Sequence, residues 1–170
     1  MTVCRMVFQT AFGYAAAAYV AHPFQLHKVY LPRQTRNIVM DDIFNDFEII
    51  EGHHPNIDIL VKHMQHYFQG HPIQTPWAWL KWDTMTSLQA QTLKQTAQIP
   101  FGAVCTYQQL AQNIGRPKAV RFVGSCMARN PYPIIIPCHR VIRSDGSIGQ
   151  FGGGASLKKR LLALEQTRAS

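Results

Sequence analysis

The sequence contains little charge, few cysteines and no long apolar run. Charged residues make up 15% of the 170 residues, and with 46% apolar residues this composition argues against intrinsic disorder. No apolar stretch reaches the ~18 residues that a membrane helix needs. The longest run of small apolar residues, Ala15–Ala21, has neither the basic start nor the length of a signal peptide. Membrane, secreted and fibrous proteins are therefore not expected, and no membrane partner is predicted.

The four cysteines are widely spaced in the chain, at positions 4, 105, 126 and 138. A disulfide framework normally belongs to a short secreted sequence with many cysteines, which this chain is not. We therefore predict a reducing compartment, the cytoplasm or, in a eukaryote, the nucleus. Each thiol is then either a small core residue or a reactive group.

Acidic residues are scarce in the C-terminal part of the chain. Residues 100–170 hold only Asp145 and Glu165 against ten basic residues, whereas residues 1–99 hold seven of each sign. The whole formal excess of +8 therefore lies after residue 99. This asymmetry predicts an anionic partner, with nucleic acid as the first candidate. A solvated basic surface is the alternative, and charge alone does not decide between them.

The order of apolar patterns predicts an α+β protein with two domains. An N-terminal domain over residues 1–85, a small β-sheet with helix, is expected to brace the rest. A mostly helical domain over residues 86–170 is expected to carry the function. Strands should alternate apolar and polar residues or form short apolar runs, whereas helices should repeat every three to four residues. In the first domain we predict strands at 10–21, 26–32 and 47–50 and a helix from Asn56 to Gly70.

Two capping boxes mark helix starts in the C-terminal domain. Thr86 is followed three residues later by Gln89, and Thr106 by Gln109. The second helix should end at Gly115, and a third is expected to begin at Pro117 and run to about Ala128. A last helix is expected at 155–166.

The pair of helices around Gly115 has the spacing of a helix-turn-helix. The second helix carries Lys118 and Arg121, while Gly124 and Ser125 leave room for a close partner. An ordinary helical hairpin is the alternative, but the basic charge of this domain favours DNA binding.

The segment after this helix contains a candidate nucleophile. We predict a short buried strand at Ile134–Ile136, which Pro137, Cys138, His139 and Arg140 follow. A cysteine attacks as its thiolate, so it needs a neighbouring base or a positive field. Neighbours on a strand point to opposite faces, so His139 could reach Cys138 only through a turn or a water. Taken alone, the pair is weak evidence for a nucleophile, because a buried structural cysteine is the commoner case.

The whole string from Ile134 to Val141 resembles the active-site signature of the O6-alkylguanine-DNA alkyltransferases, the methylated-DNA–protein-cysteine methyltransferase family. The resemblance covers roughly residues 86–166, and the first 85 residues are only loosely similar to the family's variable N-terminal domain. The matching segments include Ile99-Pro100-Phe101-Gly102, Thr106-Tyr107-Gln108-Gln109-Leu110-Ala111, Gly115-Arg116-Pro117-Lys118-Ala119, Arg121, Val123-Gly124, Arg129-Asn130-Pro131, Gly152-Gly153 and Leu161-Leu162-Ala163-Leu164-Glu165.

The resemblance implies a role for each matching residue. Cys138 would take the alkyl group from guanine O6 and keep it. His139 would accept the thiol proton through a water, Glu165 would orient His139, and Asn130 would be a hinge. Arg121 would enter the duplex in place of the flipped base. The other implied DNA contacts are Tyr107, Lys118, Ala119, Gly124 and Ser125, and the implied pocket residues are Met127, Pro133, Val141, Phe151 and Gly152.

The family further implies a monomer that acts once, without a cofactor, on double-stranded DNA containing O6-alkylguanine. Two positions depart from the common pattern, since Phe151 stands where tyrosine is frequent and Phe122 where small residues are usual. They keep open an alkyltransferase-like protein that binds the lesion without repairing it, although such relatives lack the cysteine. A cysteine hydrolase is a third, weaker alternative. No metal site is predicted, because Cys4 is the only cysteine before residue 105.

Overall fold

The computed structural model describes residues 2–169 and divides the chain into two compact units, residues 1–81 and 82–170. The predicted boundary was at residue 85. Both units combine helices with strands, so the predicted α+β class is confirmed. Within the described part of the chain, no helix combines the length and hydropathy that a membrane span requires.

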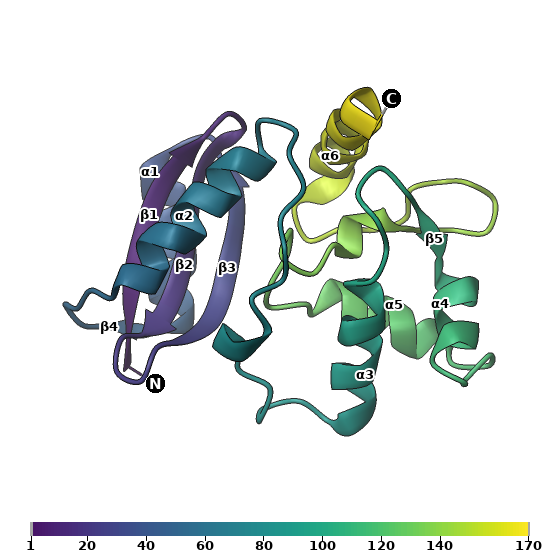
Figure 1. Cartoon of the computed structure of the whole chain (residues 1–170), viewed down its shortest axis with the longest axis horizontal. Helices are drawn as coiled ribbons and strands as arrows, with labels where there is room; N and C mark the ends of the chain where they lie inside the picture. Colours follow the sequence, from purple (N-terminus) through teal and green to yellow (C-terminus); the bar gives the residue numbers. More distant parts are fainter. Residues whose placement is uncertain (1, 170) are drawn as a thin grey trace. The chain divides into compact units, whose positions relative to one another are not determined.

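A four-stranded sheet forms the first unit (Figure 1). Its first three strands are antiparallel neighbours, and the short fourth strand pairs in parallel with the start of the first. The turn before the second strand needs Gly13, whose φ is +120° and where a Cβ would collide with the Arg33 carbonyl. The strands are β1 (Thr2–Thr10), β2 (Gly13–Val20), β3 (Gln25–Arg33) and β4 (Glu48–Ile49).

Two helices cover opposite faces of this sheet, α1 (Arg36–Asp46) behind it and α2 (Pro55–Tyr67) in front in the view of Figure 1. The run Ala15–Ala18 of β2 is fully buried, and its small side chains let both helices approach closely. α2 matches the helix predicted from residue 56. β1 and α1 were not predicted. β1 lacks the alternation of buried and exposed residues that marks a strand, and α1 buries only Val39 and Ile43, too few to give a helical apolar pattern.

The second unit contains four α-helices and a two-stranded parallel sheet. Both predicted capping boxes are confirmed. In the second of them the Thr106 hydroxyl accepts from the Gln109 backbone N–H (3.1 Å) and Gln109 Oε1 accepts from the Thr106 N–H (2.8 Å). The elements are α3 (Ser87–Thr96), β5 (Cys105–Thr106), α4 (Tyr107–Asn113), α5 (Val120–Ala128), the 3₁₀ turn η2 (Cys138–Arg140), β6 (Val141–Ile142) and α6 (Gly154–Ala169).

The predicted helix pair is α4 and α5, which pack against each other. Gly115, at φ +70°, ends the first helix as predicted. The second begins at Val120 and not at Pro117, because residues 116–119 form a turn in which the Ala119 N–H donates to the Arg116 carbonyl (2.8 Å).

The predicted strand at Ile134–Ile136 is wrong. These residues are buried, but they form a turn closed by a bridge between Pro133 and Ile136. Ile134 has φ +74°, a rare conformation for a β-branched residue. The prolines at 133 and 137 lack the N–H groups that a strand would need for pairing. The chain therefore enters the candidate site as a tight turn.

Candidate active site

Cys138 is the first residue of η2 and is 4% exposed. Because Cys138, His139 and Arg140 lie on a 3₁₀ turn, neighbouring side chains do not point to opposite faces as they would on a strand. The geometric objection raised by a strand therefore does not apply. All three side chains are buried, so this turn concentrates a thiol, an imidazole and a guanidinium inside the second unit.

The thiol of Cys138 is held in its protonated form at rest. Burial raises its pKa, and this effect outweighs a hydrogen bond from Asn130 and the positive charge of Lys158, which lower it. A thiolate is the nucleophilic form. Attack by this sulfur therefore needs a base that removes the proton when a substrate is present.

His139 is positioned to be that base by a buried carboxylate. Its Nε2 lies 2.7 Å from Oε1 of Glu165, and both side chains are inaccessible to solvent. Burial alone would raise the pKa of Glu165, but hydrogen bonds from His139 and Arg140 lower it to about 2. The carboxylate is an acceptor only, so Nε2 carries the hydrogen and Nδ1 of the neutral ring is the basic atom. Burial lowers the pKa of His139, which keeps the ring neutral near pH 7.

Arg140 completes the pairing of the same carboxylate. Its Nε donates to Glu165 Oε2 (2.9 Å) and its Nη2 donates to Oε1 (3.1 Å), while Nη1 donates to the Ile99 carbonyl (2.6 Å). The Gly102 N–H also donates to Oε2 (3.0 Å), and the guanidinium lies over the ring of Phe101, 5.7 Å from its centroid. A buried ion pair is stable only when such extra hydrogen bonds satisfy it.

Lys158 is a second buried cation beside the thiol. It stands in a run of three basic residues with Lys159 and Arg160, a pattern typical of a solvated face, and for Lys158 that interpretation is wrong. Its side chain is inaccessible, Nζ donates to the Val141 carbonyl (2.6 Å), and the ammonium lies 5.9 Å from the centroid of the Tyr107 ring. Burial lowers its pKa to about 8, against the opposing attraction of Cys138.

Asn130 fixes the turn that leads to Cys138. Its Nδ2 donates to the Ile136 carbonyl (2.9 Å), and its Oδ1 accepts from the Tyr132 N–H (3.0 Å). The side chain thus links the end of α5 to the turn before η2, the place where the family resemblance puts a hinge.

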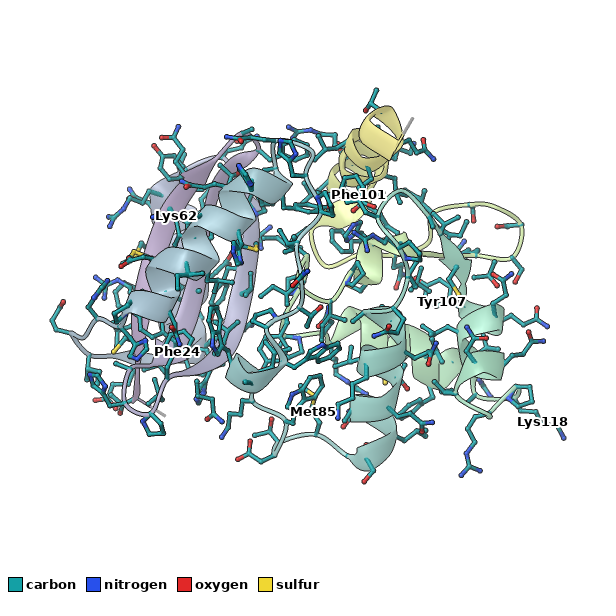
Figure 2. All side chains as sticks on the ribbon, viewed as in Figure 1. Phe24, Lys62, Met85, Phe101, Tyr107 and Lys118 are labelled. Atoms are coloured by element: carbon teal, nitrogen blue, oxygen red, sulfur yellow. The ribbon has the colours of Figure 1, made fainter. Side chains whose placement is uncertain are left out.

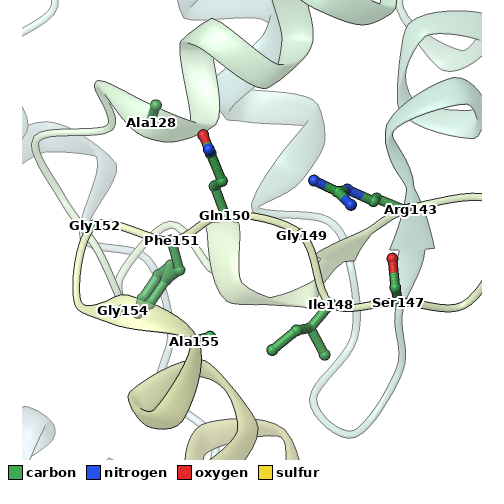
Figure 3. Close-up of a pocket in the computed structure, with 10 residues that line it drawn as sticks. All are labelled: Ala128, Arg143, Ser147, Ile148, Gly149, Gln150, Phe151, Gly152, Gly154 and Ala155. Carbon is green, nitrogen blue, oxygen red and sulfur yellow. The ribbon is translucent and has the colours of Figure 1, made fainter.

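A cavity of about 620 Å³ lies between the end of α5 and the segment from Arg143 to Ala155 (Figure 3). Two of the five expected pocket residues, Phe151 and Gly152, line it. Phe151 also meets the His139 ring edge-on at 6.4 Å, so the cavity adjoins the catalytic cluster. The other three, Met127, Pro133 and Val141, are buried and do not line the cavity.

Comparison with known proteins shows what the part of the chain that carries this cluster is similar to. A sequence profile described as "6-O-methylguanine DNA methyltransferase, DNA binding domain" matches residues 87–167. The methylated-DNA–protein-cysteine methyltransferase of Rattus norvegicus is 59% identical over 68 residues, which are 39% of this chain and 32% of the rat protein. The chain therefore spans about a third of the length of that relative.

Solved structures resemble the whole chain. The O6-methylguanine methyltransferase of Mycobacterium tuberculosis aligns over 99% of this chain and 95% of its own, with a TM-score of 0.77 and 28% identity. A structure of the OGT protein of the same organism in complex with DNA aligns with a TM-score of 0.75 and 27% identity, over 99% of this chain and 94% of its own. Residues 87–167 are therefore similar to the DNA-binding domain of the 6-O-methylguanine DNA methyltransferases.

Apart from Tyr107, the residues at which the methyltransferase family implies DNA contact lie on or near α5. Lys118 and Arg121 are exposed, and Lys118 extends away from the unit in Figure 2. Ala119, Ser125 and Gly124 are half-buried, and a Cβ added at Gly124 would meet no atom within 4 Å. This side of α5 is therefore open and accessible.

Tyr107 lies apart from α5, at the start of α4, and is half-buried (Figure 2). Burial raises the pKa of its hydroxyl, so the group stays protonated and can donate a hydrogen bond. Phe122, the unusual residue on α5, is half-buried.

Sequence reasoning missed Arg140, Lys158 and Arg143 as parts of the site. A signal was present for Lys158, since it precedes Glu165 by two helical turns and therefore shares a face with it. Once Glu165 is placed inside, Lys158 must be inside too. For Arg143, which lines the cavity, the sequence offered no comparable signal.

Among residues 2–169, no group of three or more His, Cys, Asp or Glu side chains is arranged to hold a metal ion. His63 and His66 are exposed on α2. His53 instead pairs with Asp58 at 3.0 Å on the surface of the first unit.

Proposed function

We propose that this chain repairs O6-alkylguanine in duplex DNA by transferring the alkyl group irreversibly to Cys138. The observation that carries the proposal is the buried pair of His139 and Glu165, whose Nε2 and Oε1 atoms lie 2.7 Å apart. His139 directly follows the cysteine in the chain. The similarity of residues 87–167 to the methyltransferase family supports the same reaction. A structural cysteine would need no ionised carboxylate oriented on a neighbouring imidazole.

The reaction begins with loss of the thiol proton. The proton passes from Cys138 to Nδ1 of His139, through a water, and the resulting imidazolium is stabilised by Glu165. The sulfur lone pair then forms a bond to the alkyl carbon as the bond from that carbon to guanine O6 breaks. Guanine takes up the proton, so the balance is one thiol and one alkylated base giving one thioether and one normal base.

Tyr107 and Lys158 support the departure of the base. A guanine that loses its alkyl group develops negative charge, which a hydrogen-bond donor stabilises. The protonated hydroxyl of Tyr107 is such a donor, and the ammonium of Lys158 lies beside its ring. No cofactor takes part in this scheme, and the alkylated cysteine is its end point.

The substrate must be a base that has left the helix. Cys138 is only 4% exposed, so a base stacked within a duplex could not reach it. The basic second unit supplies a sequence-independent attraction to phosphates, and Arg121 on α5 would fill the vacated space. The OGT protein of M. tuberculosis, which has been solved with DNA, supports DNA as the partner. All residues of the scheme come from one chain, so a monomer should suffice.

The test mixes the protein with a duplex containing one O6-methylguanine and follows both molecules by mass spectrometry. We expect one methyl group on the peptide that contains Cys138, restored guanine, and an end point of one lesion per protein. Cys138→Ser should abolish transfer, while Cys105→Ser, which removes a half-buried thiol of the same unit, should retain it. Lesion binding without transfer would favour the alkyltransferase-like alternative. Repeated turnover would favour a hydrolase, and either result would refute the proposal.

A further inference from the structure

Arg143 stands on the wall of the cavity, directly after β6. Its backbone closes a tight turn, because its N–H donates to the Ser147 carbonyl (2.9 Å) and its carbonyl accepts from the Gly146 N–H (3.0 Å). The turn fixes where the side chain starts. In Figure 3 the guanidinium reaches across the cavity toward Gln150.

Gly149 lies close to both Arg143 and Tyr107. A Cβ placed on Gly149 would lie 3.1 Å from the Tyr107 hydroxyl and 3.6 Å from Cγ of Arg143. The same backbone position therefore contacts both side chains. The charge of Arg143 is also felt by Tyr107 and Lys158, since it lowers the pKa of each.

The guanidinium is not committed to a protein carboxylate. Over residues 2–169, Arg143 forms no ion pair. The nearest acid in sequence, Asp145, accepts the Ser147 N–H (2.9 Å) within its own turn, and hydrogen bonds from Ser147 and, more weakly, the charge of Arg143 lower the pKa of Asp145. Arg140, by contrast, is fully paired with Glu165. A planar guanidinium facing a cavity is suited to bind a carboxylate through two parallel hydrogen bonds.

The cavity has room for more than a methyl group. Its volume is about 620 Å³, and much of its wall is backbone or a methyl side chain, as at Gly152 and Ala155. We propose that Arg143 is a specificity-determining residue that makes this site accept O6 substituents ending in a carboxylate, of which O6-carboxymethylguanine is the smallest. This inference rests on the proposed alkyl transfer and names a substrate class for it. As with methyl, the bond from the substituent carbon to guanine O6 breaks while a bond from that carbon to the sulfur of Cys138 forms. The product is S-carboxymethylated Cys138.

The experiment measures single-turnover rate constants on two duplexes that differ only in carrying O6-methylguanine or O6-carboxymethylguanine. The quantity of interest is the ratio of the carboxymethyl to the methyl rate constant, so that the methyl lesion reports on folding and general DNA affinity. In Arg143→Gln we expect this ratio to fall about tenfold, as for loss of a charge-assisted bidentate contact. Arg143→Lys should recover part of it. Lys159→Gln, which removes an exposed cation of α6 outside the cavity, should leave the ratio unchanged.

Two outcomes would overturn the inference. A parallel fall of both rate constants would make Arg143 a phosphate contact, which attracts every duplex equally. An unchanged ratio in Arg143→Gln would show that the guanidinium does not reach the substituent. Failure of the wild-type protein to accept even the methyl group would instead refute the proposed function, so the two failures are distinguishable.

Discussion

Replacing Glu165 by Gln removes one buried charge while preserving size and shape. The carboxylate accepts hydrogen bonds from His139, Arg140 and the Gly102 backbone. In Glu165→Gln the guanidinium of Arg140 would lose its only counter-ion in the described structure. The imidazole would lose the charge that stabilises its protonated form.

The size of the stability effect follows from the pKa of Glu165. The hydrogen bonds to His139 and Arg140 bring it from 4.5 to about 2, which corresponds to about 3 kcal/mol of folding free energy. Because the folded pKa is the lower one, this stability is present above about pH 4.5 and is lost as the pH falls toward 2. The variant should therefore be about 3 kcal/mol less stable at pH 7, with a difference that shrinks in acid. Alkyl transfer should slow by about 10²- to 10⁴-fold, the range for loss of general-base support.

The stability difference is measured by urea unfolding at pH 7 and at pH 3, and the rate by single-turnover transfer from a methylated duplex. Glu51→Gln, the same change at an exposed position of the first unit, serves as the control and should alter neither quantity. A Glu165→Gln protein that folds and transfers methyl at the wild-type rate would refute the assigned relay. So would a stability loss that does not diminish in acid.

Two further predictions concern neighbouring features. In the folded chain the pKa of Lys158 is about 8 instead of 10.5, so the unfolded state binds more protons between these values and stability should rise with pH across that window. Lys158→Met should lack this rise in urea titrations at pH 8 and 10, and should transfer methyl more slowly. Thr106→Ala and Thr86→Ala each remove a capping box and should each cost about 1 kcal/mol in thermal unfolding. Only the former, at the start of α4 beside Tyr107, should also weaken lesion binding in fluorescence anisotropy; equal binding losses would contradict this.

The helices of the second unit could be predicted because their signals are local. A threonine with a glutamine three residues later satisfies the first backbone N–H groups of a helix whatever surrounds it. The apolar stripe of α6 is local in the same sense. Each such pattern describes contacts within a few residues, and sequence alone contains them.

The turn at Ile134 and the burial of Lys158 could not be read in this way. Three consecutive isoleucines indicate burial, and they are buried, but the flanking prolines and the bonds from Asn130 decide the backbone conformation. Three consecutive basic residues on a helix indicate solvent, yet the helix rotates Lys158 inward with Glu165. The turn depends on contacts between segments distant in sequence, which periodicity does not describe. For Lys158, the helical spacing to Glu165 is informative only once Glu165 is known to be buried.

The arrangement of charges around the thiol explains why so buried a cysteine can react. Moving a proton from Cys138 to His139 creates a thiolate and an imidazolium in a buried region shielded from bulk water, which would be costly without partners. Lys158 already lies beside the sulfur, and Glu165 already lies against the imidazole. Each charge that forms therefore meets an opposite one already in place, and no solvent must reorganise. The resting thiol stays protonated until an alkylated guanine enters the site, which suits a cysteine that accepts an alkyl group only once.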